Sequence, residues 1–445
     1  MRKKLILTGA VLGIAAFGAQ AQSTDDLKRA LAQAQAAAEQ AQDAARRAQA
    51  ALEQALAAAA QARQSVAAAP APSTGVTAQV VPGSGLTVRS GNSFVQLYGL
   101  IDITAFSKNH VNGTGQSVFS PDVAWFSGNR WGLTGQHKLG GSDGDLKAIF
   151  RLESEFESQT GNEDTPGVLF NRDAWLGMES PALGKLTFGR QNALARDPAA
   201  SATYGDPYGP QKASVEEGGY TNNNDFKQLI FYAGSATGTR YDRGVVWKKD
   251  WGSLVSGLAY QFGGVAGSFG KNSSETASLA YNGPSFTVAG FVTSANVNNY
   301  RHRTESIGGN MQVSPLIRVN AGYYHYTAEQ AAVGSRRDNA WTLSTKITPP
   351  GAFDYELGYQ IMDAKNAGVN GAGYVLNAYG NTSGVAAAVS GKRKTLYGSA
   401  FYHFDAQTEV YVAADHLSTT GGYKAAQANG FMSQTELGLG MRFKF

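Results

Sequence analysis

The sequence has no cysteine, few charged residues and no long hydrophobic run beyond its first residues. Without cysteine it cannot form disulfides, thiolate zinc sites or iron–sulfur clusters, or use a thiol nucleophile. Charged residues make up 16% of the 445 residues, against about 25% in ordinary soluble domains. After residue 21 no apolar run approaches the roughly 20 residues of a membrane-spanning helix, which excludes a helical membrane bundle.

Glycine and aromatic residues are abundant instead. Glycine occupies 54 of the 445 positions, well above the usual share of about 7%. Aromatic residues make up 11% of the chain, and the mean hydropathy is only mildly polar at −0.26. This composition favours a chain rich in β-structure, and such chains often run long as a single domain.

The first 21 residues have the composition of a secretory signal peptide. A positive start, Arg2–Lys4, precedes the 13 apolar residues Leu5–Phe17 and an A-x-A cleavage site that ends at Ala21. An N-terminal membrane anchor is the alternative, but thirteen residues are too few to span about 30 Å of hydrocarbon as a helix. Removal of the segment takes the net charge from +4 to +1, which argues against nucleic acid as a partner. The sequence therefore predicts export from the cytoplasm.

Residues 22–69 are rich in alanine and glutamine and contain neither glycine nor proline. With Leu31 at heptad position a, Leu52 and Val66 also fall at a and Leu27 falls at d, and alanine occupies the other core positions. A sustained repeat of this kind predicts a left-handed coiled coil and self-association. Because alanine is common throughout, an alanine-rich single helix or a disordered stalk remains an alternative. Prolines and glycines then predict a linker over residues 70–93.

From about residue 94 the hydrophobic period changes to two. The segment AFDYELGYQIM, residues 352–362, alternates large apolar and polar or small residues, as a strand with one apolar face does. A soluble β-sandwich gives the same alternation of side chains along its strands. Here, however, short turns and long loops alternate as the connections between successive strands. That arrangement is typical of an outer-membrane barrel. Long loops are expected near 108–122, 158–167, 192–239, 263–273, 296–302, 328–338, 363–391 and 419–432.

The alternating stretches number sixteen, an even count as in single-chain bacterial barrels. The segment Asp225–Gly234 could pass for a further strand, and we assign it to the third long loop. The expected fold is therefore an all-β transmembrane barrel of 16 antiparallel strands after a helical coiled coil. The expected strands are 94–107, 123–138, 145–157, 168–179, 185–191, 240–249, 253–262, 274–282, 285–295, 303–313, 316–327, 339–348, 352–362, 392–404, 408–418 and 433–445.

Tryptophans in these strands, among them Trp131, Trp175, Trp247 and Trp341, are candidates for the aromatic girdles at the two membrane interfaces. Cross-strand aromatic packing is the alternative.

Three stretches resemble the general diffusion porins of Gram-negative outer membranes: LYGLID at 97–102, NRWGLTGQHKLGGSDGDLKAIFRLESEF at 129–156 and NRDAWLGMESPALGKLTFGRQ at 171–191. The C-terminal Phe445 is similar to the signal by which such barrels are recognised for insertion. The resemblance implies a homotrimer with three pores, a third loop folded into each lumen and both termini in the periplasm. The expected organisation is a signal peptide at 1–21, a periplasmic coiled coil at 22–69, a linker at 70–93 and an outer-membrane barrel at 94–445.

Four arginines are candidates for the basic wall of a pore constriction. Strand parity turns Arg130 and Arg151 toward the lumen. The resemblance places Arg130 and Arg172 where the family carries its constriction arginines, and Arg190 directly precedes the third loop. Wall ion pairs without a role in selectivity are the alternative. The opposing acids are expected in the third loop, where solvated loop charges are the alternative: Asp197, Asp206, Glu216 and Glu217.

Enzymatic sites are not indicated. The six histidines are scattered without metal-ligand spacing, and no nucleophile elbow or phosphate-binding loop is complete. We therefore expect no cofactor, no metal and no catalytic residue. The predicted function is a passive outer-membrane porin for small hydrophilic solutes and ions, in contact with outer-membrane lipid. Two alternatives are a selective channel for small anions such as carboxylates, and an envelope tether whose coiled coil contacts peptidoglycan.

Overall fold

The computed structural model describes residues 75–81, 85–122, 125–139, 145–196 and 234–445. The chain divides into two units, Met1–Ser73 and Thr74–Phe445. In the first unit only Glu39, Arg46, Ala50 and Glu53 are described, and all four are helical and exposed. No helix in the described part is both long and apolar enough to cross a bilayer. Outside the described residues lie the predicted signal peptide, most of Asp225–Gly234, and the predicted coiled-coil core residues Leu27, Leu31, Leu52 and Val66.

The described part of the second unit is a single antiparallel sheet of nineteen strands. Alternation of large apolar residues with polar or small ones produces these strands, because successive side chains point to opposite faces. The strands are β1 (Thr77–Val81), β2 (Gly85–Ser90), β3 (Ser93–Lys108), β4 (Val118–Asp122), β5 (Asn129–Lys138), β6 (Lys147–Phe156), β7 (Asp173–Ser180), β8 (Gly184–Asn192), β9 (Arg240–Asp250), β10 (Leu254–Gln261), β11 (Ser274–Asn282), β12 (Phe286–Val297), β13 (Tyr300–Ser314), β14 (Ile317–Ala328), β15 (Arg336–Ile347), β16 (Phe353–Gly368), β17 (Ala388–His403), β18 (Thr408–Gly421) and β19 (Ser433–Lys444).

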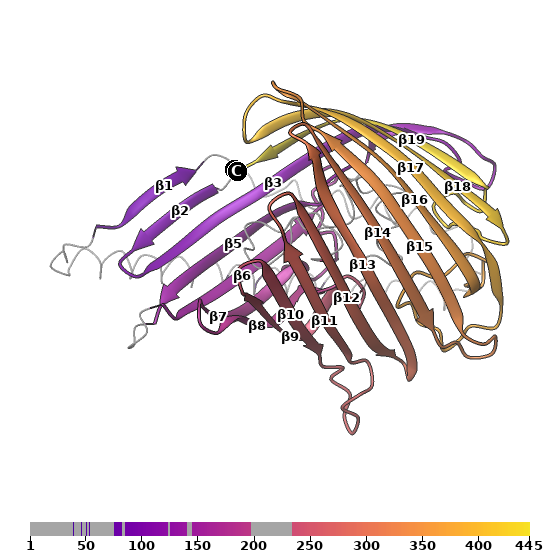
Figure 1. Cartoon of the computed structure of the whole chain (residues 1–445), viewed down its shortest axis with the longest axis horizontal. Helices are drawn as coiled ribbons and strands as arrows, with labels where there is room; N and C mark the ends of the chain where they lie inside the picture. Colours follow the sequence, from indigo (N-terminus) through magenta and orange to yellow (C-terminus); the bar gives the residue numbers. More distant parts are fainter. Residues whose placement is uncertain are drawn as a thin grey trace. The chain divides into compact units, whose positions relative to one another are not determined.

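Sixteen of these strands close into a barrel. Neighbours in sequence pair around the wall, and β19 returns to pair with β3, the first strand of the ring. Figure 1 shows the yellow end of the chain beside the violet β3. Phe445 completes the closure, since its backbone N–H donates to the Gly99 carbonyl over 3.0 Å and its carbonyl accepts from Gly99 over 2.8 Å.

The first strand of the ring is also where short extra strands attach. The first half of β3 pairs with β2 and β5, and its second half pairs with β19 and β4. β1 pairs with β2, so the described parts of residues 77–90 form a two-stranded extension of the wall. The linker predicted over residues 70–93 is therefore wrong for this stretch. Leu86 and Val88 do alternate with polar residues there. The alternating stretch is too short to indicate a strand in a segment rich in proline and glycine.

The sixteen predicted strands are confirmed, each by one strand of the ring. The second begins later than predicted, at Asn129, because residues 125–128 leave the wall and enter the barrel. The long loop expected at 296–302 is wrong. Here β12 and β13 join through the two residues Asn298 and Asn299, and Val297 pairs directly with Tyr300.

This turn has a sequence signature that hydrophobic period alone does not reveal. Asn298 and Asn299 have φ of 52° and 72°, the positive values that a type I′ hairpin turn requires at both central positions. The Asn296 side chain accepts from the Asn299 backbone N–H over 2.7 Å and fixes the corner. Asparagine tolerates this conformation better than other non-glycine residues.

Replacing Asn299 by valine is expected to lower the free energy of unfolding by about 1–2 kcal/mol, because a β-branched residue is strained at positive φ. Asn299→Gly, the matched control, is expected to leave stability unchanged or raise it. Urea unfolding of the barrel from lipid vesicles measures both. Equal stabilities for the valine and glycine variants would contradict the strained-turn account.

A candidate charged wall inside the barrel

The inner face of β3, β5 and β6 carries a carboxylate held by a tyrosine from two strands away. Tyr98 of β3 pairs with Gly132 of β5, which in turn pairs with Glu153 of β6. Because Gly132 has no side chain, the Tyr98 ring passes over it and its hydroxyl donates to Glu153 Oε2 over 2.7 Å. A Cβ at position 132 would lie 2.7 Å from that hydroxyl oxygen. Glycine is therefore required here by close approach.

Arg172 completes the cluster immediately before β7. Its Nε donates to Glu153 and its Nη1 donates to Glu155, so one guanidinium bridges two carboxylates of β6. Only 3% of the Arg172 side chain is exposed. A buried, doubly paired guanidinium of this kind holds the two acids in place.

Arg130 and Arg151 also face the lumen, as their strand parity predicts. Arg130 pairs across the sheet with Glu155, is half-buried, and donates from Nε to the Gly128 carbonyl over 2.8 Å. Arg151 Nη1 lies 3.9 Å from Asp173 Oδ2. Their side chains are more exposed than that of Arg172: Arg151 is 12% exposed and Arg130 is half-buried, against 3% for Arg172.

Trp175 belongs to the inner face as well. It pairs with Arg151 across β6 and β7, and the Arg151 guanidinium lies 5.9 Å from the centre of its ring. Its neighbour Leu176 is exposed on the opposite, outer face. The prediction of Trp175 as a membrane-interface residue is therefore wrong, since alternation puts it inside.

Arg190 lies on the other side of the wall. The Thr187 hydroxyl donates to the Gln191 amide oxygen over 2.6 Å, and both residues are buried. Phe188 is 48% exposed on the outer face, and Arg190 shares its parity. There Arg190 pairs with Asp242 and donates from Nε to the Asn171 carbonyl over 2.6 Å. The structure thus places Arg190 on the outer side, and its prediction as a pore-wall residue is wrong.

The described base of the third loop turns into the barrel. Ala193, Leu194 and Ala195 are buried, and the Leu194 backbone N–H donates to the Tyr241 hydroxyl over 3.1 Å. Leu194 packs with the inward residues Tyr241 and Ala259. This agrees with a third loop that folds into the lumen. The predicted opposing acids Asp197, Asp206, Glu216 and Glu217 lie outside the described residues.

A second inward element was missed by sequence reasoning. Trp125 and Phe126 leave the wall before β5 and pack against the inner face of the closing strands, and the Ser127 hydroxyl accepts from Arg442 over 2.9 Å. Asp102 of β3 anchors them, since its Oδ2 accepts from the backbone N–H of Phe126 over 3.1 Å and of Ser127 over 3.0 Å. Trp125 occupies the space above Gly438, where a Cβ would lie 2.5 Å from the indole ring. The only signal in the sequence is the break in alternation at AWFSG.

A second charged network lies on the inner face near the opposite end of the strands. Lys346 Nζ lies 3.1 Å from Asp354 and 3.4 Å from Glu356. His403 bridges Asp354 and Glu409, with both separations at 3.0 Å. Acids and bases are again paired across strands, so the charge of the described wall is locally balanced.

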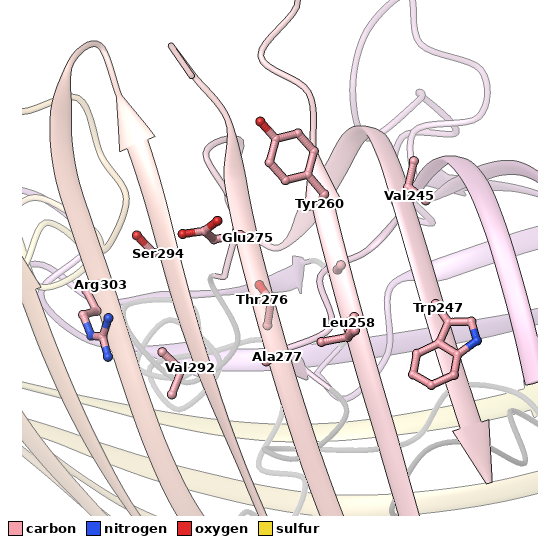
Figure 2. Close-up of a pocket in the computed structure, with 11 residues that line it drawn as sticks. Val245, Trp247, Leu258, Tyr260, Glu275, Thr276, Ala277, Val292, Ser294 and Arg303 are labelled. Carbon is pink, nitrogen blue, oxygen red and sulfur yellow. The ribbon is translucent and has the colours of Figure 1, made fainter. Parts of the chain in front are cut away.

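The outer wall carries a shallow groove of about 470 Å³ between β9 and β13. Trp247, Leu258 and Val292 form its apolar part, and Glu275 and Arg303 lie toward one end (Figure 2). Leu258 is 55% exposed, as expected on a surface that faces lipid. The groove is separate from the lumen. Among the described residues no three histidine or acidic side chains form a metal-binding group.

Comparison with known families decides what kind of barrel this is. A model described as Gram-negative porin matches residues 48–422. The chain belongs to this porin family.

A sequence relative of this porin supports its assignment to the family. Over 128 residues it is 39% identical to an outer membrane porin protein of Bordetella pertussis, a match that covers 26% of this chain and 31% of that protein. The aligned region thus spans about a third of that relative's length. The porin family and the closed barrel together place the protein in the outer membrane.

Solved structures share the fold. The anion-selective porin from Comamonas acidovorans superposes with a TM-score of 0.60 at 18% identity, covering 79% of this porin and all of that chain. The Vibrio cholerae protein OmpT gives a TM-score of 0.55 at 12% identity, covering 80% of this porin and 99% of OmpT. OmpF of Salmonella typhi gives 0.52 at 12% identity, covering 80% of this porin and 98% of OmpF.

Proposed function

We propose that this porin forms a passive, water-filled channel for small hydrophilic solutes and ions, with no enzymatic step. The observation that carries the proposal is the closed ring of sixteen strands with polar and charged residues on its inner face. A ring of this size encloses an aqueous channel, whereas about eight strands would fill it with side chains. The exposed apolar residues on the outer face would contact outer-membrane lipid.

We further propose that the charged wall of β5–β7 sorts solutes, with Arg130 and Arg151 as the arginines that act on them. The side chains of both are more exposed to the lumen than that of Arg172, whose guanidinium is already occupied by two carboxylates. A transverse field across a narrow pore orients dipolar solutes and sets ion preference. The third-loop acids Asp197, Asp206, Glu216 and Glu217 are proposed as the opposing side. The pairing of wall arginines with acids favours a charge-balanced pore over a dedicated carboxylate channel.

A homotrimer is proposed as the functional assembly. A trimer form is known for OmpT of Vibrio cholerae, which shares the fold. The pairing of Phe445 with Gly99 closes each barrel separately, so each protomer would supply its own pore.

The double variant Arg130→Gln, Arg151→Gln is expected to raise the cation-to-anion permeability ratio several-fold, because it removes two positive charges from the pore wall. Reversal potentials in planar bilayers under a salt gradient measure the ratio. Arg303→Gln is the matched control, since Arg303 points to the outer face. An unchanged ratio in the double variant would exclude this wall from selectivity, and wild-type protein that opens no pores would overturn the porin proposal itself.

A further inference from the structure

The loop between β16 and β17, residues 369–387, folds back into the barrel instead of standing above it. Tyr379 of this loop contacts the inner face of β13 and β14. The Tyr379 backbone N–H donates to the Tyr326 hydroxyl over 3.0 Å, and its own hydroxyl donates to Thr304 Oγ1 over 3.0 Å. Three strand spacings separate β16 from β13, so the loop tip lies about 14 Å around the wall from its own strand.

Polar contacts hold the loop on both sides of this tip. Before it, the Leu376 carbonyl accepts from Arg336 Nη1 over 2.6 Å, and Arg336 is itself fixed by Asp338 on β15. After it, Thr382 donates to the Glu329 carbonyl over 2.8 Å. The loop connects β16 and β17, but its partners lie elsewhere: Arg336 and Asp338 belong to β15, and Glu329 directly follows β14. The loop is thus clamped to the inner wall at three successive points.

Aromatic and aliphatic packing covers the same part of the wall. The Tyr379 ring stacks on His302 of β13 with centres 5.7 Å apart and an interplanar angle of 25°. The loop packs into one buried cluster with inward residues of the wall, and the β18–β19 loop joins it. The β16–β17 loop contributes Val375, Ala378 and Tyr379 to that cluster, and the β18–β19 loop contributes Tyr423, Ala425 and Ala428.

The covered surface is inward-facing, as alternation along β15 shows. Ala340 is fully buried in the cluster, whereas its neighbour Trp341 is 58% exposed on the outer face. A pore wall in contact with water would carry polar side chains at such positions. Here Tyr324, Ala340 and Met362 form an apolar patch on the inner wall, and the loop packs against that patch. The loop therefore takes up cross-section that the ring of strands would otherwise leave open.

Hydroxyl groups join this loop to the base of the third loop. Thr304, which accepts from the Tyr379 hydroxyl, pairs across the sheet with Thr293 of β12, and the hydroxyl oxygens of Thr293 and Thr276 are 3.0 Å apart. The Tyr241 hydroxyl donates to Thr276 over 2.8 Å and accepts from the Leu194 backbone N–H. The two inward loops are thus connected across the inner face of β9, β11 and β12.

We propose that the β16–β17 loop is a second constriction element of the pore, with Tyr379 as its anchoring tip. This inference rests on the proposed channel function. The solute path is then bounded on one side by this loop and on the other by the charged wall of β5–β7. Pore size is set jointly by this loop and the third loop, and the hydroxyl chain fixes one relative to the other.

The test compares pores of full-length protein in planar bilayers and in proteoliposomes that swell in neutral sugars of increasing size. Tyr379→Ala is expected to raise single-channel conductance by roughly 1.5-fold, and replacement of residues 371–384 by a short Gly-Ser linker by roughly twofold, because conductance scales with open cross-section. Both variants are expected to admit larger sugars. Tyr379→Phe keeps the ring but loses the hydroxyl that reaches Thr304, so it is expected to change conductance less than Tyr379→Ala.

Two controls separate the possible outcomes. Tyr374→Ala removes a half-buried tyrosine of the same loop, and shortening of the exposed β10–β11 loop removes a similar length of chain. Neither is expected to change conductance or the sugar limit. Heat-modifiable migration on gels verifies that each barrel is folded. Unchanged conductance and sugar limit in both Tyr379→Ala and the linker variant would overturn the second constriction, whereas wild-type protein without pores would instead refute the channel function.

Discussion

Arg172→Ala is expected to lower the free energy of unfolding of the barrel by about 3–5 kcal/mol, the usual loss when one member of a buried ion pair is removed. The reason is that the carboxylates of Glu153 and Glu155 both accept hydrogen bonds from this one guanidinium and are buried with it. Urea unfolding from lipid vesicles, followed by tryptophan fluorescence, measures the loss.

The structure offers a matched control on the outer face. Arg303 and Glu305 also form an ion pair, with 2.7 Å between Nε and Oε1, but the two side chains are 49% and 46% exposed. Arg303→Ala is expected to cost only about 0–1 kcal/mol, because an ion pair between two half-exposed side chains contributes little to stability. Equal losses for the two alanine variants would contradict the buried-clamp account of Arg172.

Two further variants test why the loss of Arg172 destabilises the barrel. Arg172→Lys keeps the charge but loses the fork that reaches two carboxylates, so an intermediate stability is expected. Combining Arg172→Ala with Glu153→Gln and Glu155→Gln is expected to recover part of the loss, since the two buried side chains that lose Arg172 are then neutral. If the triple variant is no more stable than Arg172→Ala, lost packing and not unpaired charge explains the effect.

The sequence predicts the wall well because the wall depends on local pattern. Alternation along each strand is a property of neighbouring residues, and a lipid-facing side makes it strong, as in the exposed run of Leu437, Leu439 and Met441 on β19. The turn at Asn298 and Asn299 was missed for the converse reason. Its signal lies in the backbone preferences of two residues and not in hydrophobic period.

Pore-facing residues are predictable only as far as alternation continues. Arg130 and Arg151 lie within strands, so parity gives their direction correctly. Arg172 precedes β7, and Arg190 lies at a register irregularity between Gly189 and Gln191, where the pairing of β8 with β9 shifts. The acids that pair with these arginines depend on register between strands, which no single stretch of sequence specifies.

The elements inside the lumen depend on contacts between distant parts of the chain. Tyr379 bonds to Thr304, 75 residues away, and Tyr411 bonds to Asp102, 309 residues away. Loop sequences carry no periodicity that reveals such contacts. The inward positions of residues 125–128 and of the β16–β17 loop could therefore not be predicted, and the inward third loop was expected only from the family resemblance. The same contacts make their anchors sensitive to substitution, and Asp102 is the clearest example.

Asp102→Ala is expected to destabilise the barrel by about 2–6 kcal/mol, because two backbone N–H groups lose their acceptor at roughly 1–3 kcal/mol each when buried. Asp102 is fully buried, accepts from Phe126 and Ser127, and also accepts from the Tyr411 hydroxyl over 2.5 Å. Release of residues 125–128 from the wall is further expected to add current noise in planar bilayers. Urea unfolding from vesicles measures the loss of stability.

Asp405 provides the matched control for this prediction. It also accepts from two backbone N–H groups, those of Gln407 over 2.8 Å and Thr408 over 2.7 Å, but it lies in the exposed turn between β17 and β18. Asp405→Ala is expected to cost far less than Asp102→Ala, because water satisfies the donors that lose their partner. Asp102→Asn, which keeps one acceptor oxygen, should fall between them. Equal losses in Asp405→Ala and Asp102→Ala, or quiet currents in Asp102→Ala, would show that Asp102 does not anchor the inward segment.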